Sequence, residues 1–313
     1  MRKISNILKK RNKYLAPSFS LSYDEPLFIK RGEGQYLFDH EGNKYLDAIN
    51  NISHVGHCHP KVVEAAYNQS ILLNTNTRYL HESILDYSSS LIDKLPDNLT
   101  TCFFTNSGSE SNDLALRIAR LYNNSKESIV MSGAYHGHTN SLIDISPYKF
   151  FGSGGAGKKD FVHVVPMPNE FAGEHLDTGS IFGDYYITAL KNKIDKIKKD
   201  GKKLAFFIVE PIMGCGGQVI IPNDFMKEAF VLVKEAGGLF IVDEVQIGFG
   251  RIGTHFWGFE MSGVRPDIVT LGKSIGNGHP LSVVITTKQI AETFNNGMEY
   301  FNSFGGNPVS CKI

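Results

Sequence analysis

The fold is decided by Gly238-Leu-Phe-Ile-Val-Asp243-Glu-Val-Gln246, an apolar run that ends in two carboxylates. A second apolar run, Asp267-Ile-Val-Thr-Leu271, leads in the same way into Gly272 and Lys273. Short apolar runs bounded by glycine and polar residues are typical of buried strands. Because the carboxyl ends of parallel strands meet at one edge of a sheet, the two runs predict a carboxylate and a lysine close together at that edge.

Strand-like runs alternate with helical patterns along most of the chain. This alternation predicts an α/β fold, with a seven-stranded, mostly parallel sheet covered by helices on both faces. The seven predicted strands are residues 101–105, 128–131, 161–165, 204–209, 239–242, 268–271 and 281–286, and the helical patterns between them include 110–122, 185–199 and 223–236.

The N-terminal part of the chain differs from the rest. Apolar and basic residues from Ile4 to Arg11 fall at helical spacing, which favours a surface helix that packs on a partner subunit over an organelle transit peptide. Residues 27–39 and 41–47 predict a small hairpin that turns at His40-Glu-Gly42. We therefore expect an N-terminal segment at 1–50 and a large domain at 51–313.

Composition restricts the class of protein. The 313 residues include 32 Lys plus Arg and 32 Asp plus Glu, so no basic excess favours nucleic acid or an anionic membrane as partner. The four cysteines form no C-x-x-C pair, which suits a reducing compartment and predicts a cytoplasmic location. No apolar run approaches the ~20 residues of a membrane span.

A buried carboxylate beside a lysine is what pyridoxal phosphate requires. The cofactor withdraws electrons only while its ring nitrogen is protonated, and a carboxylate in a dry site holds that proton; we assign this role to Asp243. The cofactor must also be held as a Schiff base by a lysine amine, for which Lys273 is the candidate. Each residue alone has a simpler explanation, a helix cap for the Asp243-Glu pair and a solvated side chain for Lys273.

Two further segments follow predicted strands. In Thr105-Asn-Ser-Gly-Ser-Glu110 a strand ends, a glycine turn follows and a helix begins with Ser107 or Ser109 near its cap. The free N–H groups of a helix N-terminus bind anions, so this turn predicts a phosphate seat, although a capped helix alone would explain it. In Gly133-Ala-Tyr-His-Gly137, either Tyr135 or His136 could lie flat on a cofactor ring.

Together these motifs resemble the class III aminotransferases, a branch of the fold type I pyridoxal phosphate enzymes, along essentially the whole chain. The resemblance implies that Gly108 and Ser109 hold the phosphate, that Tyr135 or His136 supplies the stacking ring, and that Asp243 and Gln246 contact the ring nitrogen and the phenolic oxygen. It also implies Lys273 as the Schiff-base lysine and places the carboxylate of Glu210-Pro on the substrate side. The loop Asn302-Ser303-Phe-Gly-Gly-Asn-Pro308 implies a homodimer in which Ser303 reaches the partner's cofactor phosphate.

Within that family, Asn50-Asn-Ile-Ser-His-Val-Gly-His57 and Leu73-Asn-Thr-Asn-Thr-Arg78 resemble a subgroup of alanine–glyoxylate aminotransferase-like proteins and phospho-lyases. The resemblance implies transfer of an amino group from a primary amine or amino acid to a keto acid. The alternative is a phospho-lyase acting on ethanolamine phosphate or phosphohydroxylysine. Both reactions begin with removal of a proton by Lys273, and the residues do not distinguish them.

The family pattern continues beyond Ile313 with a small C-terminal domain that commonly supplies a carboxylate-binding arginine, so we expect that domain to be absent from this chain. A truncated, non-catalytic chain is therefore a further alternative. Two other classes are weaker. Gly152-Ser-Gly-Gly-Ala-Gly-Lys-Lys159 nearly forms a P-loop but lacks its Ser or Thr, and the histidines at 54, 57, 59, 136 and 138 do not have the spacing of a hydrolytic zinc site. We therefore expect no bound metal.

Overall fold

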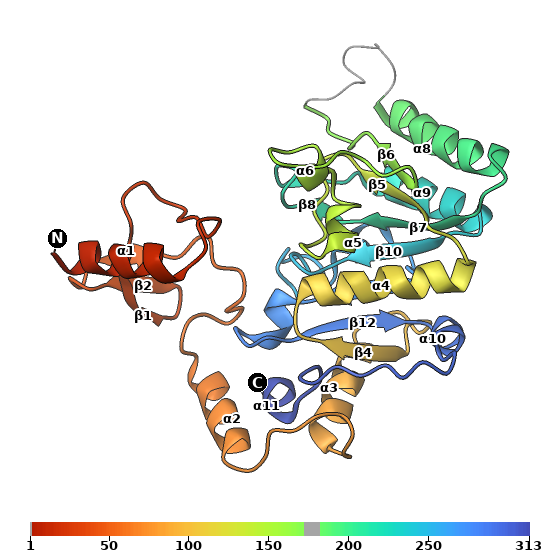
Figure 1. Ribbon diagram of the computed structural model, residues 1–313. Coiled ribbons are helices and arrows are strands. Elements are labelled where there is room, and N and C mark those ends of the chain that lie inside the picture. The colour runs from red at the N-terminus through yellow and green to blue at the C-terminus, as the bar shows by residue number, and fades with distance from the viewer. Residues whose placement is uncertain (1, 172–181) are drawn as a thin grey trace.

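The computed structural model describes residues 2–171 and 182–313, and its centre is a seven-stranded sheet in the order β4-β12-β11-β10-β7-β5-β6 (Figure 1). Neighbouring strands from β11 to β6 are parallel, whereas β12 runs antiparallel to β11 and β4. The predicted mostly parallel sheet is therefore confirmed. Its strands are β4 (Thr101–Thr105), β5 (Glu127–Met131), β6 (Val162–Val165), β7 (Leu204–Val209), β10 (Leu239–Asp243), β11 (Ile268–Leu271) and β12 (Ser282–Thr286).

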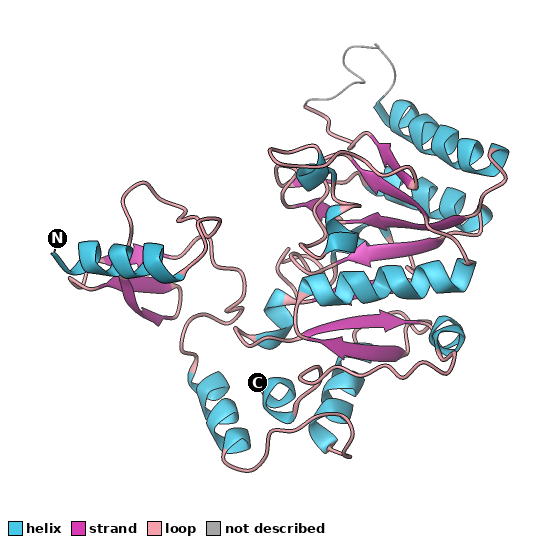
Figure 2. Cartoon of the chain, in the orientation of Figure 1, coloured by secondary structure: helices cyan, strands magenta, loops and turns pink. Residues whose placement is uncertain are grey.

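Helices cover both faces of this sheet (Figure 2). Alternate side chains of β7 enter different cores: Phe207 belongs to the core that includes residues of α8 and α9, and Phe206 belongs to the core that includes residues of α4 and α10. Every residue of β7 is buried, as expected for a parallel strand covered on both sides. One face carries α4 (Gly108–Asn123), α5 (Asn140–Ile143), α6 (Pro147–Phe150) and α10 (Lys288–Phe294), and the other carries α8 (Phe182–Lys199) and α9 (Asn223–Glu235).

The N-terminal segment lies to one side of the large sheet (Figure 1). The helical spacing near Ile4 is confirmed as α1 (Arg2–Tyr14). The single hairpin was wrong in one respect, because the segment forms three antiparallel strands, β1 (Ile29–Glu33), β2 (Tyr36–Asp39) and β3 (Lys44–Leu46). The first predicted arm turns back at Gly34, whose φ of +53° favours glycine.

A third group of helices lies below the sheet in Figure 1, where α11 (Pro308–Lys312) packs against α2 (Pro60–Ser70) and α3 (Glu82–Ile92). The remaining elements are the two-residue strands β8 (Ile212–Met213) and β9 (Val219–Ile220) and the 3-10 turns η1 (Gly258–Ser262) and η2 (Lys273–Gly276). Among the described residues, no helix is both long and apolar enough to cross a membrane.

Candidate active site

The segments that follow β4, β5, β7, β10 and β11 meet around one cavity of about 280 Å³, which we call the lysine cavity. It contains every residue that the sequence predicted for the site except Ser303. The predicted residues that line it are Ser107, Gly108, Ser109, Tyr135, His136, Glu210, Asp243, Gln246 and Lys273. Each of these residues lies at or just beyond the carboxyl end of a strand, and these ends share one edge of the sheet. Side chains up to 166 positions apart, between residues 107 and 273, therefore line the same cavity.

Asp243 is the last residue of β10 and is buried, with 5% of its surface exposed. Its Oδ2 accepts a hydrogen bond from Asn112 Nδ2 at 2.8 Å and lies 2.9 Å from His136 Nδ1. Its Oδ1 accepts from the backbone N–H of Val245. Since no lysine or arginine of the described residues lies within 4.0 Å of the carboxylate, its charge is not neutralised by a fixed strong cation.

Asn112 and Thr270 fix the orientation of Asp243, and sequence reasoning missed both. Thr270 Oγ1 donates to Asn112 Oδ1 at 2.6 Å, which leaves the amide nitrogen of Asn112 to donate to Asp243. Both residues are almost completely buried. A polar residue on the apolar face of a predicted helix, and a threonine in an otherwise aliphatic strand, were the signals that could have revealed them.

Lys273 begins the 3-10 turn η2, one residue after the end of β11. Its Nζ donates to Gln246 Oε1 at 2.8 Å, so a residue beyond the end of β10 holds the amine in the cavity. The backbone of Lys273 has φ +42°, a left-handed conformation that costs roughly 1–2 kcal/mol for a residue with a side chain. Such conformations are kept where the surroundings fix them, and they concentrate at functional sites.

The predicted phosphate seat lies at the N-terminus of α4. Ser107 is the N-cap, and its side chain accepts from the backbone N–H of Glu110. The next two N–H groups, of Gly108 and Ser109, lack intrahelical acceptors by their position in the helix. A Cβ on Gly108 would lie 2.6 Å from Val245 Cγ1, so only glycine lets the turn approach the end of β10 so closely.

Tyr135 and Glu210 lie beside each other at the ends of β5 and β7. The Glu210 carboxylate accepts from the N–H of Tyr135 and from that of Gly214, each at 3.2 Å. Burial raises the pKa of Glu210, partly offset by His136, while Asp243 raises it further. The Tyr135 ring is half-buried, whereas the His136 ring is buried and bonded to Asp243, so of the two Tyr135 is the more accessible stacking ring.

Ser303 is the one predicted residue that the structure places elsewhere. It is exposed and does not line the lysine cavity. Its neighbour Asn302 accepts a hydrogen bond from Asn106 Nδ2 at 2.9 Å, so the loop touches the segment that leads into the phosphate seat from outside.

The alternatives from the sequence can be located as well. The glycine-rich segment 152–159 leads into strand β6 and not into a helix. Over residues 2–171 and 182–313, no three His, Cys, Asp or Glu side chains are grouped closely enough to hold a metal ion.

This sheet, with a lysine, a buried carboxylate and a helix N-terminus around one cavity, has the arrangement of the large domain of fold type I pyridoxal phosphate enzymes. The family model for class III aminotransferases matches residues 19–313, and the chain belongs to that family.

Its relatives include both kinds of enzyme that the sequence left open. The chain is 46% identical over 98% of its length to a Drosophila melanogaster protein named alanine–glyoxylate aminotransferase 2-like, and it spans 63% of that relative. It is 42% identical to ethanolamine-phosphate phospho-lyase homolog 1 of Caenorhabditis elegans, in a match that covers 99% of this chain and 69% of that relative. A phospholyase from Arthrobacter in complex with phosphoethanolamine superposes with a TM-score of 0.90 at 35% identity. The superposition covers 98% of this chain and 72% of the phospholyase chain.

Pyridoxal phosphate is the cofactor of this family, and the residues present fit it. The cavity offers a lysine amine, a buried carboxylate with no fixed strong cation, and a helix N-terminus for a phosphate. The buried Nε2 of His136 has no hydrogen-bond partner among the described residues, a further sign that the polar end of this cavity is built around a bound group.

Proposed function

We propose that this chain is a pyridoxal-phosphate-dependent transaminase that moves an amino group from a primary amine or amino acid to a keto acid. The observation that carries the proposal is the position of Lys273 Nζ, held 2.8 Å from Gln246 Oε1 in the same cavity as the buried Asp243. Family membership supports the reaction class, and the choice of donor and acceptor stays open.

Each residue then has a distinct part. When bound, the cofactor supplies an electron sink that makes the α-proton of the amine acidic. Asp243 would hold a proton on the ring nitrogen, and Asn112 keeps its carboxylate in place. Lys273 would hold the cofactor covalently, and its released amine then carries the proton from the substrate carbon. Ser107, Gly108 and Ser109 would bind the phosphate, and Tyr135 would cover the ring.

The first test is uptake of the cofactor. Purified protein supplied with pyridoxal phosphate should become yellow, and borohydride should fix the cofactor on Lys273, which peptide mass spectrometry locates. Lys273→Ala should abolish the fixed adduct, whereas Lys288→Ala on the surface of α10 should leave it unchanged. A protein that takes up no cofactor would support the alternative of a non-catalytic chain.

A phospho-lyase is the second candidate, favoured by the fold match to the Arthrobacter phospholyase. Here Lys273 removes the same proton, but a phosphate leaves the neighbouring carbon. Ethanolamine phosphate offered without any keto acid separates the two reactions. Release of inorganic phosphate under these conditions would replace the transaminase assignment; strict dependence on a keto acid would retain it.

We further propose that the active form is a homodimer. The exposed position of Ser303, outside its own lysine cavity, supports a role toward the partner's cofactor phosphate. Light scattering of the cofactor-loaded protein would test the dimer, and Ser303→Ala should weaken cofactor binding. The cytoplasmic location and the domain limits at 1–50 and 51–313 stay predictions.

A further inference from the structure

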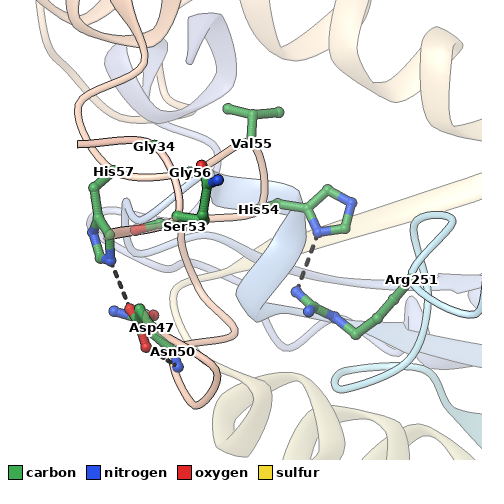
Figure 3. A pocket seen from close by; sticks show the side chains of 10 residues that line it. Gly34, Asp47, Asn50, Ser53, His54, Val55, Gly56, His57 and Arg251 are labelled. Atoms are coloured by element: carbon green, nitrogen blue, oxygen red, sulfur yellow. Dashed lines mark hydrogen bonds and ion pairs between the residues drawn. The ribbon is translucent and has the colours of Figure 1, made fainter. Parts of the chain in front are cut away.

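A second cavity of about 360 Å³ lies where the N-terminal segment meets the loop after β10 (Figure 3). We call it the arginine cavity, because Arg251 points into it from that loop. Its polar walls are Asp47, Asn50, Ser53, His54, His57 and Arg251. Neither the proposed chemistry nor the cofactor uses these side chains.

Arg251 carries a positive charge without a carboxylate partner. No carboxylate of the described residues lies within 4.0 Å of its guanidinium. Its Nη2 instead contacts neutral acceptors, Asn51 O at 2.9 Å and Ser274 Oγ at 3.1 Å. Burial lowers the pKa of Arg251. A partly buried cation with neutral partners favours an added anion.

The other ionisable groups of the arginine cavity do not supply that anion. Asp47 is the one carboxylate in its walls, and it is already bonded to His57 Nε2 at 2.6 Å and to the N–H groups of Ile49 and Asn50. His54 Nε2 lies 2.7 Å from Phe249 O and must donate to it, because a carbonyl only accepts. If His54 is neutral, its Nδ1 is then free to accept from Arg251 at 3.2 Å.

A third cavity of about 730 Å³ joins the arginine cavity to the lysine cavity through shared walls, and we call it the bridging cavity. It shares Arg251, Asp47 and Asn50 with the arginine cavity, and it shares Gln246 with the lysine cavity. Gln246 is the residue that binds Lys273 Nζ. The bridging cavity is thus lined by Gln246, which binds the Lys273 amine, and by Arg251, whose guanidinium has no carboxylate partner among the described residues.

We propose that Arg251 binds the anionic end group, a carboxylate or a phosphate, of the amine whose nitrogen reacts at Lys273. This inference rests on the proposed function, since it assumes an amine substrate in the lysine cavity. Arg251 is then a specificity-determining residue, and an amine with a charged far end is preferred over an uncharged one of similar length. A forked guanidinium can bind either oxyanion with two hydrogen bonds.

The kinetic test compares three amines on the cofactor-loaded protein: ethanolamine phosphate, β-alanine, and propylamine, which has no charge at its far end. Stopped-flow absorbance follows the first step with each amine, so transaminase and phospho-lyase chemistry are scored alike. In Arg251→Met the preference for the anionic amines over propylamine should fall by about 10- to 100-fold. Arg251→Lys should keep part of it, and Arg31→Met, a surface arginine on β1, should keep all of it.

The three amines also identify the anion. If the wild-type preference over propylamine appears only with ethanolamine phosphate, the end group is a phosphate; if only with β-alanine, it is a carboxylate. A wild-type protein without any preference, or an Arg251→Met variant that slows all three amines equally, would overturn the proposal, because Arg251 would then only tie Asn51 and Ser274 together. Arg251→Gln can still bind those two oxygens and serves if the methionine variant does not fold.

A binding measurement separates this proposal from the proposed function. Calorimetry with 2-hydroxyethyl phosphate and 3-hydroxypropanoate, which carry the anion but no amine, should give a Kd at least about tenfold weaker in Arg251→Met. If the protein takes up no pyridoxal phosphate, the proposed function fails. The difference in anion Kd between wild type and Arg251→Met still tests whether Arg251 binds the anion. If cofactor and amines react but both proteins bind the anions equally, only the Arg251 proposal fails.

Discussion

Buried carboxylates at the two ends of the central sheet differ in whether a cationic side chain compensates their charge. At the amino end of β5, Glu127 lies 2.7 Å from Lys202 Nζ and 2.6 Å from His163 Nε2. Burial opposes its ionisation, but these two partners outweigh that effect and lower the pKa of Glu127. At the carboxyl end, Asp243 and Glu210 have neutral donors and His136 but no lysine or arginine partner among the described residues.

The difference shows where the chain keeps charge available for a ligand. Compensated charge stabilises the fold, as at Glu127, whereas uncompensated charge beside a cavity is stabilised by what binds there. Arg251 follows the second pattern with the opposite sign. Changes at the two ends should therefore separate activity from stability.

The largest effect is expected for Asp243→Asn at the carboxyl end. An amide carries no charge to hold the ring proton, so the rate of proton removal should fall by about 10²- to 10³-fold. The amide oxygen can still accept from Asn112, whereas the amide nitrogen then faces the N–H of Val245, so the fold should persist with a loss of about 1–3 kcal/mol. Single-turnover kinetics and thermal melts measure the two properties. Loss below tenfold, or unfolding of the variant, would remove the proposed contrast.

The residues at this carboxyl end could be predicted from the sequence because each of them lies just after an apolar run. Asp243 follows one apolar run, Lys273 comes one residue after a second, and Gly108 comes shortly after a third, so strand-end geometry alone brings them together. It could not find Asn112 or Thr270, because their roles depend on which helix face meets β11 across the sheet. It missed the third strand of the N-terminal segment for a similar reason, since the turn at Gly34 lies inside one continuous run.

A second prediction concerns Glu244, the neighbour of Asp243, which faces away from the lysine cavity. Its buried carboxylate accepts from the N–H groups of Gly258 and Phe259, and burial raises its pKa from 4.5 to about 7. The folded state then binds a proton more tightly than the unfolded state, so this contribution to stability is full below pH 4.5 and is lost as the pH rises to about 7.

Denaturant unfolding across that range should show a decline of about 3 kcal/mol from this group. Glu244→Gln should flatten the profile, because an amide does not titrate. Glu292→Gln on the surface of α10 is the matched control and should reproduce the wild-type slope. A wild-type slope in Glu244→Gln would mean that another group titrates in this range.

The third prediction tests the amino end. Glu127→Gln removes the charge that Lys202 and His163 both contact, and it should lower the free energy of unfolding by about 1–3 kcal/mol. The rate of the cofactor-loaded protein should stay within about twofold of wild type, because Glu127 lies at the opposite end of the strands from Lys273. Equal loss of rate and stability would show that the ends are not independent.

The smallest effect is expected for Ser111→Ala in the first turn of α4. Ser111 Oγ donates to Gly108 O at 3.1 Å and lies 2.9 Å from Ser282 Oγ, which also contacts Leu271 O. Without Ser111, the Ser282 hydroxyl can donate to Leu271 O alone, so no buried group loses its last partner. The free energy of unfolding should change by less than about 1 kcal/mol.

Thr270→Val is the matched contrast. It leaves Asn112 Oδ1 without its donor, so it should lower the free energy of unfolding by about 1–3 kcal/mol and weaken cofactor binding. If the two substitutions cost the same, the hydrogen bonds behind Asp243 do not distinguish positioning of the carboxylate from general packing.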